Sequence, residues 1–400
     1  MDRLHSQKIW DIASALRLTS NGSPADAILV FCDARAAAML TDFPDCATPS
    51  ELLDIMEATL GTTFEVVRSD DELVALQRRY VQAGEWGFAA LDKELQGDVY
   101  GVTYRRMTAR IGERSFVSVI DCRGDKGLRS YFTKWHEIGH LLILTDKQRS
   151  TYKRTHARAS SKDPEETLVD LIAGHMGFSP QFLVPEIGTE VTFADVDRIR
   201  GKLCPEASLL SSAIAYAKHH GQPCLLIDAK LALKKEEEAG LLQGSFGFYD
   251  PPTPKLRVQS VVPSNNARQY GLYIPKNYRV PVSSVIHLVY NGQQDPAAAM
   301  ECLSLWESSD GKCLGPKAIQ IEVRKSFDSV LALISLPGGI RNAAACNWYA
   351  AAPFVDQTCC GGRVDPKKIE EIAILEDPGG VLGQNSHYCC EFCPRTGLRR

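Results

Sequence analysis

The sequence lacks long apolar runs and any strong excess of charge of one sign. No stretch approaches the roughly 18–20 apolar residues that a membrane-spanning helix needs, so we expect no membrane association. The 45 Lys and Arg nearly balance the 49 Asp and Glu, for a net charge of −4, which argues against a protein built mainly to coat nucleic acid. The N-terminal residues mix charges and lead into no apolar segment, so we expect no secretory signal and a cytoplasmic protein.

Cysteine is sparse over most of the chain and abundant at its end. Of the 13 cysteines, five lie in the first 301 residues and eight in the last 99. In a reducing compartment such a cluster indicates free thiols or a metal site rather than disulfides. The turn from Cys390 to Cys393 is typical of half of a zinc knuckle, and Cys346 with Cys359 or Cys360 could complete it. A second, structural metal in this tail, an iron–sulfur cluster and a redox-sensing set of thiols all stay open.

The rest of the chain has ordinary globular composition, with 44% hydrophobic residues in 400, so two or three domains are expected. The apolar spacing predicts an α+β protein: a mainly helical domain with a small sheet over 1–220, a β-rich domain over 221–344 and a Cys-rich tail over 345–400. The β-rich domain could sense a signal or bind substrate. The predicted helices cover residues 9–18, 49–60, 72–82, 130–144, 163 onward, 193–203 and 206–219. The predicted strands cover residues 63–67, 115–120, 256–262, 271–274, 285–290, 319–323 and 330–334.

The sharpest motif is His-Glu-x-x-His within the predicted helix at 130–144. His136 and His140 are four residues apart, so a helix places both imidazoles on one face, where they can bind one metal ion. Glu137 lies beside the first imidazole, where its carboxylate can take a proton from a water on that ion. The pattern therefore predicts a zinc peptidase site with Glu137 as general base. The competing interpretation is that these are ordinary helix residues with no metal.

A catalytic zinc usually has three protein ligands, so one more is needed. The long metzincin motif would require Gly at 143 and His at 146, but Ile143 and Asp146 stand there. Glu166, at the start of the next predicted helix, is the better candidate for a site of two His and one Glu. Two alternatives stay open: Glu165 could be the ligand, or Glu166 could complete a capping box that Asp163 begins.

Two segments of this region resemble the ImmA/IrrE family of metallopeptidases. Residues 132–140 read FTKWHEIGH, which is close to that family's FTxxHExGH helix. Residues 166–173 read ETLVDLIA, which resembles that family's second motif, ExxANxFA. The resemblance covers about residues 50–220, with a motif core at 115–180, and implies that Glu166 is the third metal ligand. Val169 and Asp170 replace the family's Ala-Asn. Asp170 could orient a ligand imidazole or form a plain salt bridge.

The resemblance implies a zincin-like fold and an intracellular zinc endopeptidase that cleaves a helix-turn-helix transcriptional repressor in a stress response. The metal is expected to be Zn²⁺, with Mn²⁺ or another divalent ion as an alternative. The alternative function is a non-hydrolytic anti-repressor, or a metal or redox sensor, that acts by binding. Direct nucleic-acid binding is not expected, because the predicted β-rich domain carries only scattered Lys and Arg.

Overall fold

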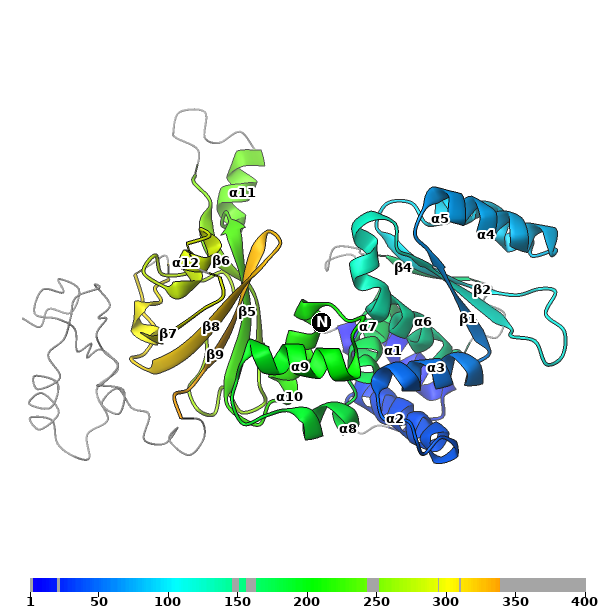
Figure 1. The fold of residues 1–400 in the computed structure, drawn as a ribbon, viewed down its shortest axis with the longest axis horizontal. Helices are drawn as coiled ribbons and strands as arrows, with labels where there is room; N and C mark the ends of the chain where they lie inside the picture. The colour runs from blue at the N-terminus through cyan, green and yellow to red at the C-terminus, as the bar shows by residue number, and fades with distance from the viewer. Residues whose placement is uncertain are drawn as a thin grey trace, which may run out of the picture. The chain divides into compact units, whose positions relative to one another are not determined.

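The chain contains both helices and strands, so the α+β class is confirmed (Figure 1). The computed structural model describes residues 3–19, 22–145, 151–155, 163–242, 252–293, 295–308 and 311–338. The Cys-rich tail predicted over 345–400 lies outside them. Among the described residues, no helix combines the length and the apolar character needed to cross a membrane.

The chain divides into two compact units. The first comprises Met1–Glu186 and Asp197–Ala215, and the second comprises Ile187–Val196 and Tyr216–Arg400. The second unit begins again at Tyr216, close to the domain limit at residue 220 that the sequence predicts. The earlier segment Ile187–Val196 also belongs to the second unit.

Helices account for most of the first unit. Several begin at side-chain caps: for α3, Thr48 and Glu51 form a capping box, and for α4, Ser69 accepts from the backbone N–H of Glu72. The helices from the N-terminus to the end of α10 are α1 (Gln7–Ala15), α2 (Pro24–Asp42), α3 (Pro49–Thr59), α4 (Asp70–Gln82), α5 (Leu91–Glu94), α6 (Ser130–Leu142), α7 (Pro164–Gly177), α8 (Pro180–Leu183), α9 (Phe193–Leu203) and α10 (Leu209–His219).

Helix α2 is the one long helix of the described chain that the sequence pattern did not predict. Its apolar and alanine residues are spread around the helix, so the periodicity that marks an amphipathic helix is weak. The start signals are nevertheless present, since Ser23 accepts a hydrogen bond from the backbone N–H of Asp26 at 3.3 Å and Pro24 occupies the first turn.

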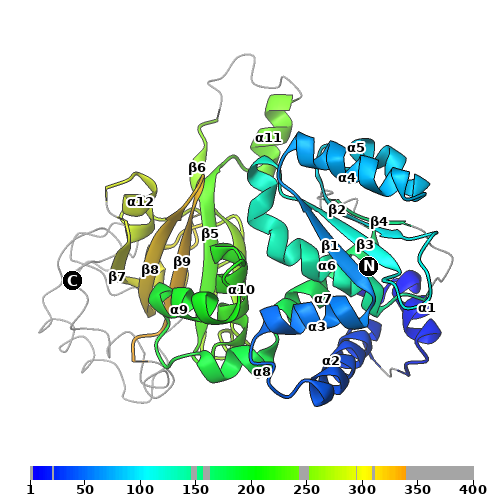
Figure 2. The ribbon, with the colours of Figure 1, turned by 45° about the vertical axis from the view of Figure 1, so that its right-hand side comes forward.

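The sheet of the first unit has four strands in the order β1-β3-β2-β4. Strands β1 (Thr62–Val67) and β3 (Phe116–Asp121) are parallel, while β2 (Val99–Arg105) is antiparallel to both β3 and β4 (Thr151–Thr155). The strands predicted at 63–67 and 115–120 are confirmed. In Figures 1 and 2, α4 and α5 lie over one face of this sheet and α6 lies over the other.

The two faces of this sheet differ in chemistry because successive side chains point to opposite sides. Val102, Tyr104 and Val119 belong to an apolar cluster with residues of α4 and α5. Thr103 and Ser118 therefore face the other way, toward α6, although both are fully buried. The alternation thus places hydroxyl groups next to the helix that carries the His-Glu-x-x-His motif.

Helices α6 and α7 pack closely because glycine stands at their contacts. A Cβ on Gly139 would lie 3.0 Å from a methyl group of Val169, and one on Gly177 would lie 2.9 Å from the indole of Trp135. The hydroxyl of Tyr131 donates to the carbonyl of Gly177 at 2.6 Å and ties the two helices together. This proximity allows side chains from α6 and α7 to meet.

The second unit contains an antiparallel five-stranded sheet in the order β6-β5-β9-β8-β7. Helix α12 (Val285–Tyr290) packs on one face of it against β7, β8 and β9, and helix α11 (Lys235–Leu242) follows β5 (Figure 2). The strands predicted at 256–262, 319–323 and 330–334 are confirmed, whereas β5 and β7 were not predicted. The strands are β5 (Cys224–Ala232), β6 (Lys255–Pro263), β7 (Ala297–Cys302), β8 (Ala318–Ser326) and β9 (Ser329–Ser335).

Two of the predicted strands are wrong. Residues 285–290 form α12: the run of β-branched residues favours a strand, but Ser284 caps the helix by accepting from the backbone N–H of Ile286 at 3.2 Å. Residues 271–274 form a turn and a loop, in which Gly271 has φ +66°. Buried and exposed positions alternate over 271–274 as they would in a strand, because Leu272 and Ile274 both pack into the core of the unit. The segment does not form a strand.

Glu301 on β7 also supports the start of α12, and it gives the second unit a pH-dependent stability. Its Oε1 accepts from the backbone N–H of Val285 at 2.7 Å and from the hydroxyl of Ser284 at 3.0 Å. Its Oε2 is buried without a hydrogen-bond partner in the described chain. Burial raises the pKa of Glu301 to about 7, although both donors act to lower it.

We expect Glu301→Gln to flatten this pH dependence. A carboxyl pKa raised on folding contributes stability that is fully present below the unfolded pKa of about 4.3 and is lost as the pH rises toward 7. Glutamine keeps an oxygen for both donors and carries no charge. The variant should therefore gain about 2–3 kcal/mol relative to the wild type between pH 4.5 and pH 8, measured by chemical unfolding. A constant difference across that range would contradict the assignment.

Candidate metal centre

The His-Glu-x-x-His motif lies in the middle of α6, as predicted, and is completely enclosed. Trp135, Ile138 and Leu142 are buried on this helix, and so are His136, Glu137 and His140, which are at most 1% exposed. The two imidazole rings stand one helical turn apart, with centroids separated by 4.9 Å. Polar side chains buried this deeply require partners, so the surrounding atoms determine what the site can do.

The third side chain of the cluster comes from the first turn of α7. Glu166 places Oε2 3.2 Å from Nε2 of His136 and Oε1 3.2 Å from Nε2 of His140. Asp163 caps α7 by accepting from the backbone N–H of Glu165 at 2.8 Å, so the predicted cap exists without the carboxylate of Glu166. The capping-box alternative for Glu166 is therefore not what the structure contains.

The three side chains fit a divalent cation. Zinc lies about 2.0–2.2 Å from nitrogen and oxygen ligands, so two ligands of a tetrahedral ion are about 3.3–3.5 Å apart, close to the separations found here. Nε2 of His136 and Oε2 of Glu166 are buried and adjacent, yet neither makes a hydrogen bond within the described chain. A cation between these two atoms would satisfy both. One ligand atom from each of His136, His140 and Glu166 lies within 4.8 Å of the other two.

The second nitrogen of each imidazole faces a carboxylate. Nδ1 of His136 lies 2.9 Å from Oδ1 of Asp170, and because an ionised carboxylate only accepts, the imidazole donates and leaves Nε2 with a lone pair. Nδ1 of His140 lies 3.6 Å from Oε1 of Glu165, beyond hydrogen-bond distance. Glu165 is thus on the far side of the ring from Glu166, and it also pairs with Lys8 at 3.0 Å.

Lys8 could not have been found from the sequence. It comes from α1, 155 residues before Asp163, and its ammonium group contacts the carboxylates of both Asp163 and Glu165. No motif surrounds it, and a lone lysine on an amphipathic helix is ordinarily a solvated residue. Its two contacts attach α1 to the beginning of α7.

Glu137 is held by a chain of buried hydroxyl groups from the sheet. Thr103 donates to Oε2 of Glu137 at 2.6 Å, so its only proton is used and Ser118 must donate to Thr103 at 2.6 Å. By the same reasoning Thr62 donates to Ser118 at 3.1 Å. Oε1 of Glu137 is buried without a hydrogen-bond partner among the described residues. The carboxylate is therefore oriented through one oxygen and available through the other.

These hydroxyl residues were missed at the sequence level. The only signal was polar character within segments of high β-propensity, as for Thr103 between Val102 and Tyr104, and such residues usually pair across strands.

The pKa values reflect an excess of negative charge around two imidazoles. Burial raises the pKa of Glu137, in part offset by His136 and His140. For His140, burial alone would lower the pKa, but Glu165 and Glu166 raise it to about 9. For Glu166, burial acts to raise the pKa, and the two imidazoles hold it below its usual range. Acidic groups outnumber the bases here, which is the electrostatic setting that a divalent cation stabilises.

Gly101 allows β2 to approach α6 closely. A Cβ at this position would lie 2.8 Å from both Oε1 of Glu137 and Cγ2 of Thr133. We expect Gly101→Ala to lower the free energy of unfolding by about 1–3 kcal/mol, because both neighbours are buried and cannot move freely. Chemical unfolding measures this. Gly201→Ala is the matched control: a Cβ there meets nothing within 4 Å, and α9 should gain up to about 1 kcal/mol. Equal effects at both positions would contradict the close approach.

Asp146, which follows the motif helix, and the tail cysteines from Cys346 onward lie outside the described residues. No disulfide joins two cysteines of the described chain.

The comparisons with known proteins assign no family. No family model matches the chain, and no curated protein matches it. Among solved structures, one described as a Mycobacterium tuberculosis transcriptional regulator is similar at 10% sequence identity and a TM-score of 0.38, covering 85% of this chain and 88% of that one. Similarity at that level carries no argument about fold or function.

Proposed function

We propose that this protein is a zinc-dependent endopeptidase with a zincin-like catalytic domain. The observation that carries the proposal is the convergence of His136, His140 and Glu166 beside a buried, oriented Glu137. When bound there, Zn²⁺ would polarise a peptide carbonyl and lower the pKa of a neighbouring water to about 7. Mn²⁺ or another divalent ion is an alternative occupant, because ligand type alone does not select among them.

Glu137 performs the proton transfers in this proposal. Thr103 fixes one carboxylate oxygen, so Oε1 takes the proton from the attacking water and later delivers it to the amine of the departing peptide. Burial raises the pKa of Glu137, which makes the carboxylate a better proton acceptor than an exposed one. Asp170 keeps His136 in the tautomer whose Nε2 carries a lone pair.

The proposed substrate is a DNA-binding repressor of the helix-turn-helix class, cleaved inside the cell in a stress response. Support comes from the resemblance of the two motif segments to ImmA/IrrE peptidases. The geometry adds that Glu166, the residue matching the family's third ligand, lies beside both imidazoles. Direct binding of nucleic acid by this chain is not part of the proposal.

The proposal can be tested without knowing the substrate in advance, by comparing the new protein N-termini that cleavage creates in cells. Cells that express the wild type or Glu137→Gln are compared by N-terminal labelling and mass spectrometry. We expect new N-termini within one or a few helix-turn-helix proteins in the wild-type cells alone. Identical sets of N-termini would contradict peptidase activity. New N-termini scattered over unrelated proteins would support an endopeptidase but contradict the repressor as its substrate.

A further inference from the structure

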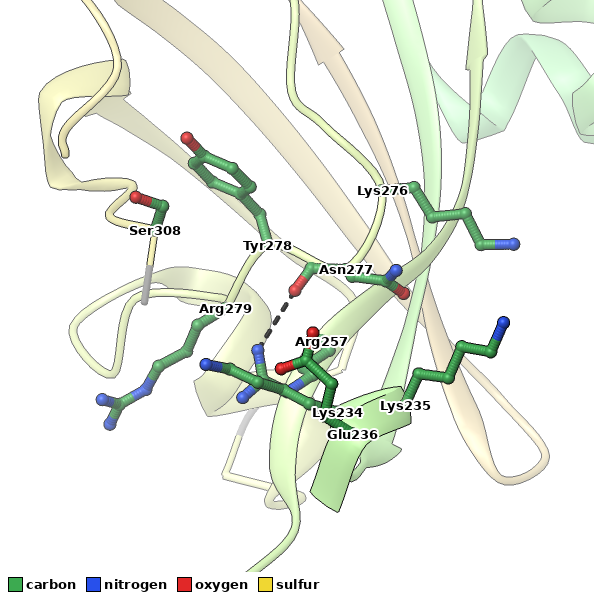
Figure 3. Close-up of a pocket in the computed structure, with 9 residues that line it drawn as sticks. All are labelled: Lys234, Lys235, Glu236, Arg257, Lys276, Asn277, Tyr278, Arg279 and Ser308. Carbon is green, nitrogen blue, oxygen red and sulfur yellow. Dashed lines mark hydrogen bonds between the residues drawn. The ribbon is translucent and has the colours of Figure 1, made fainter. Parts of the chain in front are cut away.

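The second unit contains a positively charged cavity that the proposed peptidase reaction does not use. Its volume is about 290 Å³, near the lower end of the range of small-molecule sites, about 300–1,000 Å³. Five basic residues and one acid line it, so its charge excess is 5 − 1 = +4 in a chain whose net charge is −4. The lining charged residues, shown in Figure 3, are Lys234, Lys235, Arg257, Lys276, Arg279 and Glu236.

Arg257 on β6 is the central residue of this cavity. Its side chain is only 6% exposed, although it lines the cavity. One guanidinium nitrogen donates to the carbonyl of Asn277 at 3.1 Å, while its Nε has no hydrogen-bond partner in the described chain (Figure 3). A buried cation with an unused donor is costly unless an anion reaches it, which indicates a missing acceptor.

The other cations are likewise unneutralised. Within the described residues, none of the five basic side chains forms an ion pair with a carboxylate, and Glu236 is paired with none of them. Figure 3 shows Lys235 and Lys276 to one side of Arg257 and Arg279 to the other. Like charges gathered around one cavity repel each other, so an anion bound among them would be strongly stabilised.

The backbone holds the lining in place without a ligand. Residues 277–280 pair with β6: Asn277 donates to the carbonyl of Val258 at 2.8 Å, and Val280 donates to that of Leu256 at 2.9 Å. The residues on either side of Arg257 therefore fix the segment that carries Lys276, Tyr278 and Arg279. A site that is already formed loses little entropy when it binds.

We propose that this cavity binds a small phosphorylated molecule with more than one negative charge. Several Lys and Arg donors that line one cavity suit phosphate oxygens, and the planar guanidinium of the buried Arg257 suits them best. Duplex DNA is disfavoured as the occupant, because its backbone would contact the exposed cations and leave the buried Nε of Arg257 unused. Tyr278 lines the same cavity and offers an aromatic surface to an organic part of the ligand.

Isothermal titration of the full chain tests this proposal, with pyrophosphate, ATP, adenosine and a short DNA duplex as probes at low salt. We expect pyrophosphate and ATP to bind and adenosine not to bind. The double variant Lys276→Glu with Arg279→Glu should weaken pyrophosphate binding by at least about 30-fold. Both residues are exposed, so the fold should persist, and thermal unfolding verifies this. Arg257→Gln should have a similar effect if it folds.

Lys255→Glu is the matched control, since Lys255 is an exposed cation on the same strand that does not line the cavity. It should weaken pyrophosphate binding much less than the double variant does, because Lys255 does not line the cavity and one cation is reversed rather than two. Three outcomes would overturn the proposal: no binding of pyrophosphate or ATP up to about 1 mM, equal weakening by the control and the double variant, or binding of the duplex alone.

Discussion

Glu137→Gln is expected to lower the rate of peptide cleavage by about 10²–10⁴-fold while the protein keeps its metal. The amide oxygen of glutamine can still accept the hydroxyl proton of Thr103, so the side chain should keep its position. The amide cannot take a proton from water, and proton transfer is the step assigned to this residue. Steady-state kinetics on a peptide that spans the cleavage site measures the loss, and elemental analysis measures the metal.

Thr103→Val is a milder variant for comparison with Glu137→Gln. It leaves the carboxylate but removes the donor that orients it, so we expect a smaller loss, about 10-fold, carried mainly by kcat. The proposed role of Glu137 would be contradicted if Glu137→Gln retained wild-type activity. A loss of activity that accompanied a loss of metal would instead indicate that the residue supports the site structurally.

Glu166→Gln is expected to weaken Zn²⁺ binding by at least about 100-fold, whereas Glu165→Gln should weaken it by about 10-fold or less. Glu166 faces the nitrogens that converge on the cation, and Glu165 faces the opposite nitrogen of His140 at 3.6 Å. Competition against a chromophoric chelator at pH 7.5 measures both affinities. Every protein in this comparison also carries Cys390→Ser and Cys393→Ser, so that these two thiols cannot bind the added Zn²⁺.

This pair of variants is informative because the two residues are neighbours and have the same side chain. Both variants remove one negative charge from the same turn of α7, so a purely electrostatic effect would weaken binding equally. Equal losses, or a larger loss for Glu165→Gln, would contradict Glu166 as the ligand. Thermal unfolding in the presence of a chelator separates loss of affinity from loss of fold.

The sequence predicted the motif helix because the spacing of His136 and His140 is a local property. A separation of four residues fixes their relation on any α-helix, and the apolar residues around them predict that helix. The choice between Glu165 and Glu166 stayed open for a geometric reason. Adjacent helix residues point about 100° apart, so the register of α7 against α6 decides which one faces the imidazoles, and that register depends on contacts such as those of Gly139 with Val169.

The orientation of Glu137 could not be predicted for a different reason. Thr103 contacts Glu137 from β2, 34 residues earlier in the chain, and Ser118 contacts Thr103 from β3. These contacts depend on the strand order β1-β3-β2-β4 of the sheet. The error at residues 285–290 has the same origin. Local propensity favours a strand there, but the carboxylate of Glu301, from a strand that follows, satisfies the first amide of a helix. In both cases the outcome depended on long-range hydrogen bonds that the local pattern does not encode.

Metal content per chain tests the central claim most directly, and His136→Ala is the decisive variant. The protein in which Cys390 and Cys393 are replaced by serine is purified with and without this change and analysed for bound metal. The account predicts about one divalent ion per chain in the parent protein and almost none in His136→Ala. His175→Ala is the control. Nε2 of His175 lies 2.7 Å from Oδ1 of Asp33, and His175 is not part of the cluster, so this variant should keep the ion. Equal metal content in the parent protein and in a folded His136→Ala, or no metal in either, would contradict it.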